Sequence, residues 1–145
     1  MNHNVELLNH IYKNADMGVN ACESMLTYLK EKDNKIKDTA EDILKEYEQF
    51  KESSKELLEK YDENYAETGF IGKMMSDMGI KKEVNADNSD SAMASMLIEG
   101  LTMGSINTEK KLKDYEKKID GKVKDIAENF LEFHQRAIEK LKVYL

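Results

Sequence analysis

The sequence predicts an all-α protein, a single four-helix bundle built from two antiparallel hairpins joined by a long crossover. Three observations predict this fold. The 145-residue chain contains no proline and is rich in Lys, Glu, Leu, Met and Ala, which favour helix. Apolar residues recur at intervals of three and four, and strand-forming residues never alternate in runs. The length suits one domain, 1–145, and a charged fraction of 35% suits long helices that each bury one stripe.

The first predicted hairpin joins helices over residues 4–32 and 35–65. Asp33 and Asn34 form a turn signal between them that is short enough to make the helices antiparallel. The core seam of the first helix is Leu8, Ile11, Ala15, Gly18, Cys22, Met25 and Leu29. The seam of the second helix is Ile36, Ala40, Ile43, Tyr47, Phe50, Ser54, Leu57 and Tyr61.

Residues 66–90 have a different composition and are predicted to form the crossover. Glycines and a polar run flank an apolar cluster, which predicts a short helix near residues 71–78 that ends at Gly79. A thirty-residue helix is about 45 Å long. Some two dozen residues, partly helical and partly extended, can span that distance. We therefore expect this segment to carry the chain from one end of the bundle to the other.

The second predicted hairpin joins helices over residues 91–119 and 122–144. Ser89 or Asp90 is the expected N-cap, and Asp120-Gly121 is the expected turn. The seam of the last helix is Val123, Ile126, Ala127, Phe130, Phe133, His134, Ala137, Ile138 and Leu141.

The two hairpins resemble each other in sequence. Asp16-Met17-Gly18 in the first matches Thr102-Met103-Gly104 in the second, and the same offset lays Glu48 on His134. Heptads alone generate some such matches, so duplication and coincidence both stay open. Folding each hairpin about its turn sets Gly18 at the depth of Glu48 and Gly104 near the depth of Arg136 and His134. These four positions should then converge at the middle of the bundle.

Glycines inside helices need a reason, because each costs about 1 kcal/mol relative to alanine. Gly18, Gly100 and Gly104 all occupy such positions. One reason is close approach of another helix. The other is space for a ligand, a metal or water, and the sequence leaves both open.

Several short motifs resemble the ferritin-like superfamily, and above all small uncharacterised bundle proteins of anaerobic Gram-positive bacteria. These motifs are Leu7-Leu8-Asn9-His10-Ile11-Tyr12, Met17-Gly18, Met103-Gly104, Phe133-His134 and Ile138-Glu139-Lys140-Leu141. The resemblance covers nearly the whole chain and implies a ferritin-like four-helix bundle with one long crossover. Those relatives imply no settled activity.

The metal chemistry of that superfamily fits this sequence poorly. A di-iron site needs four carboxylates and two histidines, with a Glu-x-x-His pair on each of two helices. His3, His10 and His134 are the only histidines, and none follows a glutamate by three residues. An altered site that binds iron or manganese through Glu48 and His134 stays open, with Glu99, Asp16 or Glu23 as further ligands. The alternative is that His134 is a structural histidine at the edge of the core.

The net charge and the absence of membrane or leader segments reduce the range of possible functions. A net charge of −7 argues against nucleic acid and anionic membranes as partners. No apolar run approaches a membrane span and no leader is recognisable, so we expect a cytoplasmic protein. Cys22, on an apolar seam, should be a buried and inert thiol.

Three functions remain. The first is a non-catalytic structural, storage or interaction bundle, with a homodimer as its candidate assembly. The second is a metal-binding or oxidoreductase ferritin relative with an altered mid-bundle site. The third is a bundle that binds an apolar small molecule between Gly18 and Gly104.

Overall fold

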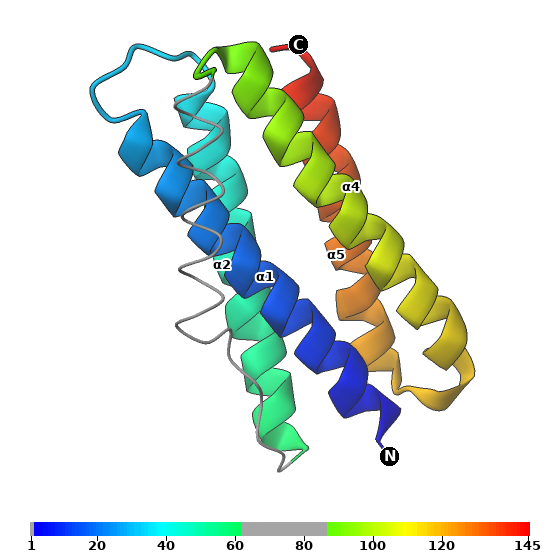
Figure 1. The fold of residues 1–145 in the computed structure, drawn as a ribbon. Coiled ribbons are helices and arrows are strands. Elements are labelled where there is room, and N and C mark those ends of the chain that lie inside the picture. Colours follow the sequence, from blue (N-terminus) through cyan, green and yellow to red (C-terminus); the bar gives the residue numbers. More distant parts are fainter. Residues whose placement is uncertain (1, 62–86) are drawn as a thin grey trace.

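The computed structural model describes residues 2–61 and 87–145, and all the regular structure in these residues is helical (Figure 1). This confirms the predicted all-α class. The elements are α1 (His3–Tyr28), α2 (Lys37–Lys60), α4 (Asp90–Tyr115), the 3₁₀ turn η1 (Glu116–Lys118) and α5 (Gly121–Lys142). The predicted short helix near residues 71–78, and the predicted crossover up to residue 86, lie outside the described residues.

Hydrogen bonds between helix ends define the directions of the four helices. The Asp90 carboxylate, at the start of α4, accepts hydrogen bonds from the backbone N–H groups of Lys35 and Ile36, just before α2. The backbone N–H of Asp120, before α5, donates to Asn4 Oδ1 near the start of α1. Therefore α2 and α4 start at one end of the bundle, and α1 and α5 start at the other (Figure 1).

Helix α1 contacts α2, α4 and α5, and α5 also contacts α2 and α4. One apolar stripe from each helix fills the core, and its largest fully buried side chains include Leu7, Leu8, Ile11, Met25, Phe130 and Phe133. Outside this stripe the helices are mostly polar, although Met17, Met103 and Ile106 are exposed. None of the described helices is long and apolar enough to cross a membrane.

An aromatic cluster joins α2 to α5 at mid-bundle. Tyr47 meets Phe133 edge to face at 4.9 Å between ring centroids, and Phe50 meets Phe130 at 5.1 Å. Aromatic pairs in this geometry contribute about 0.5–1.5 kcal/mol beyond the burial of their area. The cluster fixes the ring of Tyr47 and the turn of α5 that carries His134.

The connection between α1 and α2 is longer than predicted. Helix α1 ends at Tyr28 rather than near residue 32, and α2 begins at Lys37 rather than 35. Carbonyl groups at the end of a helix need new donors. The backbone N–H groups of Leu29 and Lys30 donate to the Met25 and Thr27 carbonyls of α1. The Lys37 ammonium donates to the backbone carbonyls of Lys30 and Lys32 in the connection that follows.

The second hairpin also differs from its predicted boundaries. Helix α4 ends at Tyr115 and continues as η1, and Ile119 is extended, with φ −123° and ψ 155°. Ser89 is the N-cap of α4, since its hydroxyl accepts from the backbone N–H of Ala92. The other predicted candidate, Asp90, caps α2 instead.

Candidate ligand-binding cleft

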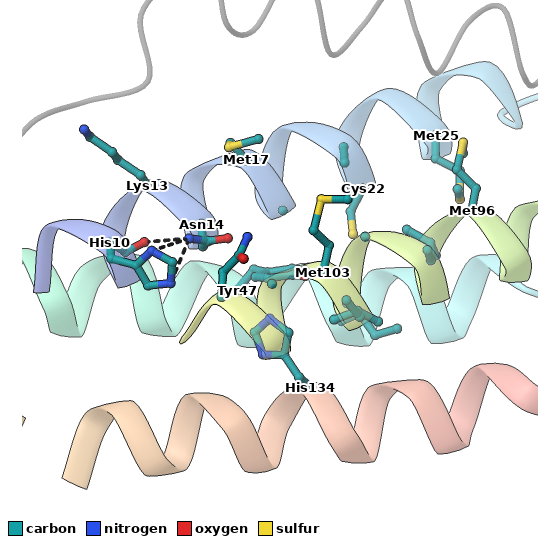
Figure 2. Close-up of a pocket in the computed structure, with 18 residues that line it drawn as sticks. His10, Lys13, Asn14, Met17, Cys22, Met25, Tyr47, Met96, Met103 and His134 are labelled. Carbon is teal, nitrogen blue, oxygen red and sulfur yellow. Dashed lines mark hydrogen bonds between the residues drawn. The ribbon is translucent and has the colours of Figure 1, made fainter. Parts of the chain in front are cut away.

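A cleft of about 510 Å³ lies at mid-bundle between α1 and α4. Eight residues of α1 and seven of α4 form its walls, while Ile43 and Tyr47 of α2 and His134 of α5 form its floor. Figure 2 shows His134 pointing from α5 toward Tyr47 and α4. The cleft thus occupies the place where the sequence predicts the glycine-marked positions to converge.

Each wall is one stripe of a helix. On α4 the stripe is Met96, Gly100, Met103 and Asn107, at steps of four, three and four residues, which share one helix face. On α1 it is His10, Asn14, Met17 and Ala21. Since the two helices run in opposite directions, His10 lies opposite Thr108, and the two side chains share a hydrogen bond of 2.8 Å.

The rim of the cleft carries side chains that are open to solvent. Met17 is 52% exposed and Met103 is 67% exposed, although both are large and apolar. Lys13 and Asn107 also line the cleft and are exposed. The floor is different, because Tyr47 and His134 are 7% and 1% exposed.

The three helix-interior glycines do different things. A Cβ atom at Gly18 would lie 2.4 Å from the ring of Tyr47, and one at Gly104 would lie 2.9 Å from Nε2 of His134. Both rings therefore pack directly on a helix backbone, and only glycine allows this contact. A Cβ atom at Gly100 would meet nothing within 4 Å. Close approach explains the first two glycines, whereas Gly100 leaves open space in the wall of the cleft.

His134 presents a hydrogen-bond acceptor to the cleft. Its Nδ1 lies 2.7 Å from the Phe130 carbonyl oxygen, so Nδ1 must carry the proton and donate it. Burial lowers the pKa of His134, against a smaller opposing effect of the bond to Phe130, so the ring is neutral at pH 7. Nε2 then carries a lone pair, and no hydrogen bond joins it to another of the described residues.

His10 and Asn14 form a polar end of the cleft. The Asn14 amide donates to the carbonyl oxygen of His10 at 2.9 Å and also contacts the imidazole of His10 (Figure 2). The pKa of His10 is lowered to about 4, mainly by burial and then by the positive charge of Lys111 and by His134. His10 is therefore neutral at pH 7.

Cys22 lies deep in the cleft wall and is fully buried. Burial, followed by the charge of Glu23, raises the pKa of its thiol to about 12. A thiol with this pKa is protonated at neutral pH and is a poor nucleophile. The prediction that this thiol is buried is confirmed.

The predicted metal ligands lie in different environments. Glu48 is exposed, and the residue of α2 that stands beside His134 is Tyr47, at 6.0 Å between ring centroids. Asp16 forms an ion pair of 2.8 Å with Lys51. Glu23 and Glu99 are exposed. Within residues 2–61 and 87–145, no group of three or more His, Cys, Asp or Glu side chains could hold a metal ion.

The sequence interpretation did not single out the polar end or the rim. A signal was present, because His10 and Asn14 are four residues apart, as are Met96 and Gly100. Stripes of this kind are also ordinary core patterns. A cleft wall differs from a core stripe in its distance from the facing helix. The spacing of apolar residues along one helix gives no information about that distance.

Comparison with known proteins gives no family for this chain. No protein-family model, no curated protein and no solved structure matches it. Function therefore has to be inferred from the cleft, because a helical bundle as a fold is compatible with many functions.

Proposed function

We propose that this protein is a non-catalytic binding bundle that holds one largely apolar small molecule between α1 and α4. The cleft of about 510 Å³ is the observation that carries this proposal. Ligand sites are typically concave, mostly apolar and about 300–1,000 Å³ in volume. The cleft also contains a few polar groups on its floor, which is how such sites orient a ligand.

The cleft is too large to be a packing imperfection. Protein interiors are close-packed, whereas this cleft is open to solvent beside the exposed side chains of Met17 and Met103. A Cβ atom at Gly100 would meet no atom within 4 Å, so a side chain at this position would enter open space. Instead this position is glycine, at a cost of about 1 kcal/mol in helix propensity. A glycine that leaves the cleft open is what we expect at a binding site.

The walls suit an apolar ligand of adaptable shape. Four methionines line the cleft, namely Met17, Met25, Met96 and Met103. Methionine is flexible and polarisable, and it is common on surfaces that adjust to their ligands. A ligand that covers these side chains would gain about 25 cal/mol per Å² of apolar area removed from water.

The groups that line the cleft favour binding over catalysis. The thiol of Cys22 is protonated, and His10 and His134 are both neutral and hydrogen-bonded. Among the described residues, none of these three has a carboxylate as a hydrogen-bonding partner to activate it. The altered metal site at Glu48 and His134 also has little support, since the Glu48 side chain is exposed.

The proposal includes the type of bundle. We infer a ferritin-like bundle, in which two antiparallel hairpins are joined by one long connection. The support is that α2 and α4 start at the same end. In ferritin-like proteins the working site lies at the centre of the bundle, and the cleft lies at the corresponding depth.

A neutral fluorescent probe, N-phenyl-1-naphthylamine, tests the proposal. The wild-type protein should bind one equivalent with saturable fluorescence enhancement. Gly100→Phe should weaken binding at least about tenfold, or 1.4 kcal/mol, because the new ring fills the cleft. Its matched control is Gly121→Phe, since Gly121 also has nothing within 4 Å of an added Cβ but lies at the start of α5.

Two results would contradict the proposal. One is a wild-type protein that does not bind the probe saturably. The other is equal binding by wild type and Gly100→Phe, which would place the probe elsewhere. Circular dichroism of each variant shows whether the helices are intact.

A further inference from the structure

We propose that the ligand is an elongated monocarboxylate with a single acyl chain of about a dozen carbons. Its carboxylate would lie at the rim near Lys13 and Asn107, and its chain would run toward Met25 and Met96. This inference rests on the proposed function, because it names the chemical class of ligand for the same cleft. Three features of the cleft support it: its length, the division between its two ends, and the charge at its polar end.

The cleft is long because two helices form its walls. Asn14 and Met25 are eleven residues apart on α1, and Met96 and Asn107 are eleven residues apart on α4. At 1.5 Å per residue, each wall is about 16 Å long. Carbon–carbon bonds of about 1.5 Å advance about 1.3 Å each along an extended chain, so about twelve carbons span this length.

One end of the cleft offers nothing to a polar group. It is lined by Ala21, Cys22, Met25, Ile43, Met96 and Leu97, and the cysteine is an uncharged thiol. A headgroup buried there would lose its hydrogen bonds to water without replacement, at a cost of several kcal/mol. This end therefore suits the methyl end of a chain.

The other end offers hydrogen-bond donors and positive charge. Lys13 and Asn107 line it, and both are exposed. Figure 2 shows the Lys13 side chain extending from α1 away from Tyr47 and His134; four rotatable methylene groups allow its ammonium to turn toward a bound anion. Lys111 is close enough to act on the charge of His10.

Two carboxylates near this end form ion pairs with lysines. Asp16, on α1, pairs with Lys51 at 2.8 Å, and Glu109, on α4, pairs with Lys113 at 3.4 Å. Lys13, which lines the cleft, and Lys111, which acts on His10, are the cations at this end of a protein whose net charge is −7. A carboxylate accepts hydrogen bonds only, which matches the ammonium of Lys13 and the amide N–H₂ of Asn107.

His134 sets the depth of the headgroup. Its Nε2 is an acceptor and cannot bond a carboxylate, so the headgroup belongs at the rim rather than on the floor. The chain would then pass over Tyr47 toward the apolar end. A bridging water is the partner expected for Nε2.

Displacement of N-phenyl-1-naphthylamine by two surfactants with the same chain tests the sign of the headgroup. Dodecanoate and dodecyltrimethylammonium are compared below their micellar concentrations. Dodecanoate should displace the probe at least about threefold more tightly, although the net charge of the protein favours the cation. Equal or tighter binding of the cation would overturn the inference.

A double variant tests the position of the headgroup. Lys13→Gln combined with Lys111→Gln should weaken dodecanoate about three- to tenfold and leave the affinity for the neutral probe unchanged. Lys140→Gln, which removes the same charge at the far end of α5, should change neither affinity. Unchanged dodecanoate affinity in the double variant would overturn the proposed position.

A series of chain lengths tests the apolar end. Affinity should rise about fourfold per methylene from octanoate to dodecanoate, as burial of each CH₂ predicts, and then level off. A rise that continues unchanged to hexadecanoate would contradict a cleft of about 16 Å. If the neutral probe itself fails to bind, the proposed function fails; if it binds but dodecanoate does not displace it, only the present inference fails.

Discussion

The glycines of the cleft predict opposite effects of the same small substitution. A methyl group at Gly18 would lie 2.4 Å from the buried ring of Tyr47, whereas at Gly100 it would meet nothing within 4 Å. Gly18→Ala should lower the free energy of unfolding by about 1–3 kcal/mol, as overpacking does. Gly100→Ala should raise it by about 0.5–1 kcal/mol through helix propensity.

Urea denaturation of the two variants measures both changes. The matched pair shares one chemical change, so differences in the unfolded state largely cancel. Stabilisation by both substitutions, or destabilisation by both to the same extent, would show that the contact between Gly18 and Tyr47 is not as described.

The buried imidazole of His10 predicts a pH dependence of stability. Its pKa is about 4 in the folded protein, against 6.5 for an unperturbed histidine. Between these values the unfolded state binds more protons, so this group lowers stability as the pH falls from about 6.5 to about 4. His134 acts in the same direction, because its pKa is also lowered by burial.

The contribution of His10 is measured by difference, since carboxylates add their own acid dependence. The free energy of unfolding of His10→Gln should fall less steeply than that of wild type between pH 6.5 and 4, and the two proteins should show parallel curves above pH 7. Parallel curves through the whole range would contradict the buried, neutral state of His10.

For individual residues, the sequence predicted the position along the bundle axis better than the direction in which each side chain points. It placed Gly104 near the depth of Arg136 and His134, and the structure places it against His134. It placed Gly18 at the level of Glu48, and the structure places it against Tyr47, one residue away. One residue turns a side chain by about 100° around a helix. That angle separates a buried ring from an exposed carboxylate, and only the packing of the aromatic cluster decides between them.

Among the helices, α2 depends on a cap that another helix provides. Its N-cap residue, Ile36, has no side-chain oxygen, and the Asp90 carboxylate accepts from the backbone N–H groups of Lys35 and Ile36 at 3.1 and 3.3 Å. Asp90→Ala should destabilise the protein by about 0.5–2 kcal/mol, because it removes the cap and a negative charge at a helix N-terminus.

A second variant with a charge change elsewhere on α4 distinguishes the loss of the cap from the general effect of removing a negative charge. Glu99 is exposed, so Glu99→Gln removes one negative charge from the same helix without removing a cap. Thermal unfolding should show a loss for Asp90→Ala and almost none for Glu99→Gln. Similar losses in both would argue against capping as the cause.

The existence of the four described helices was predictable, but their ends were not. Periodicity reports which face of a helix is buried, and this pattern is local. The helix ends depend on contacts from distant residues, such as the Asp90 cap before α2. The carbonyl groups after α1 depend in the same way on Lys37. A local sequence pattern does not contain these contacts.

In the molecule as a whole, aromatic residues join α2 to α5, and a cleft lies between α1 and α4. The sequence predicted that glycine-marked positions converge, but not that a cleft remains between them. Cleft volume depends on the separation of two helices. Interhelical distances vary with the side chains at the contact, so they follow from packing rather than from any one motif.

Ligand binding in the cleft between α1 and α4 should stabilise the whole fold. A ligand that binds only the folded state at one hundred times its Kd adds about 2.7 kcal/mol to the free energy of unfolding. For a chain of this length that corresponds to a rise in Tm of roughly 6–10 °C. Differential scanning calorimetry with dodecanoate should show this rise in wild type and little rise in Gly100→Phe. Equal rises in both proteins would contradict binding in the cleft.

The central claim is that the space between α1 and α4 is a binding site, and NMR of methionine methyl groups tests it most directly. Met17, Met25, Met96 and Met103 line the cleft, whereas Met93 is buried elsewhere on α4. On titration with N-phenyl-1-naphthylamine, the first four methyl signals should shift together and saturate, and the signal of Met93 should stay in place. If those four signals stay unchanged at saturating probe, or if Met93 shifts as much as they do, the cleft is not the site.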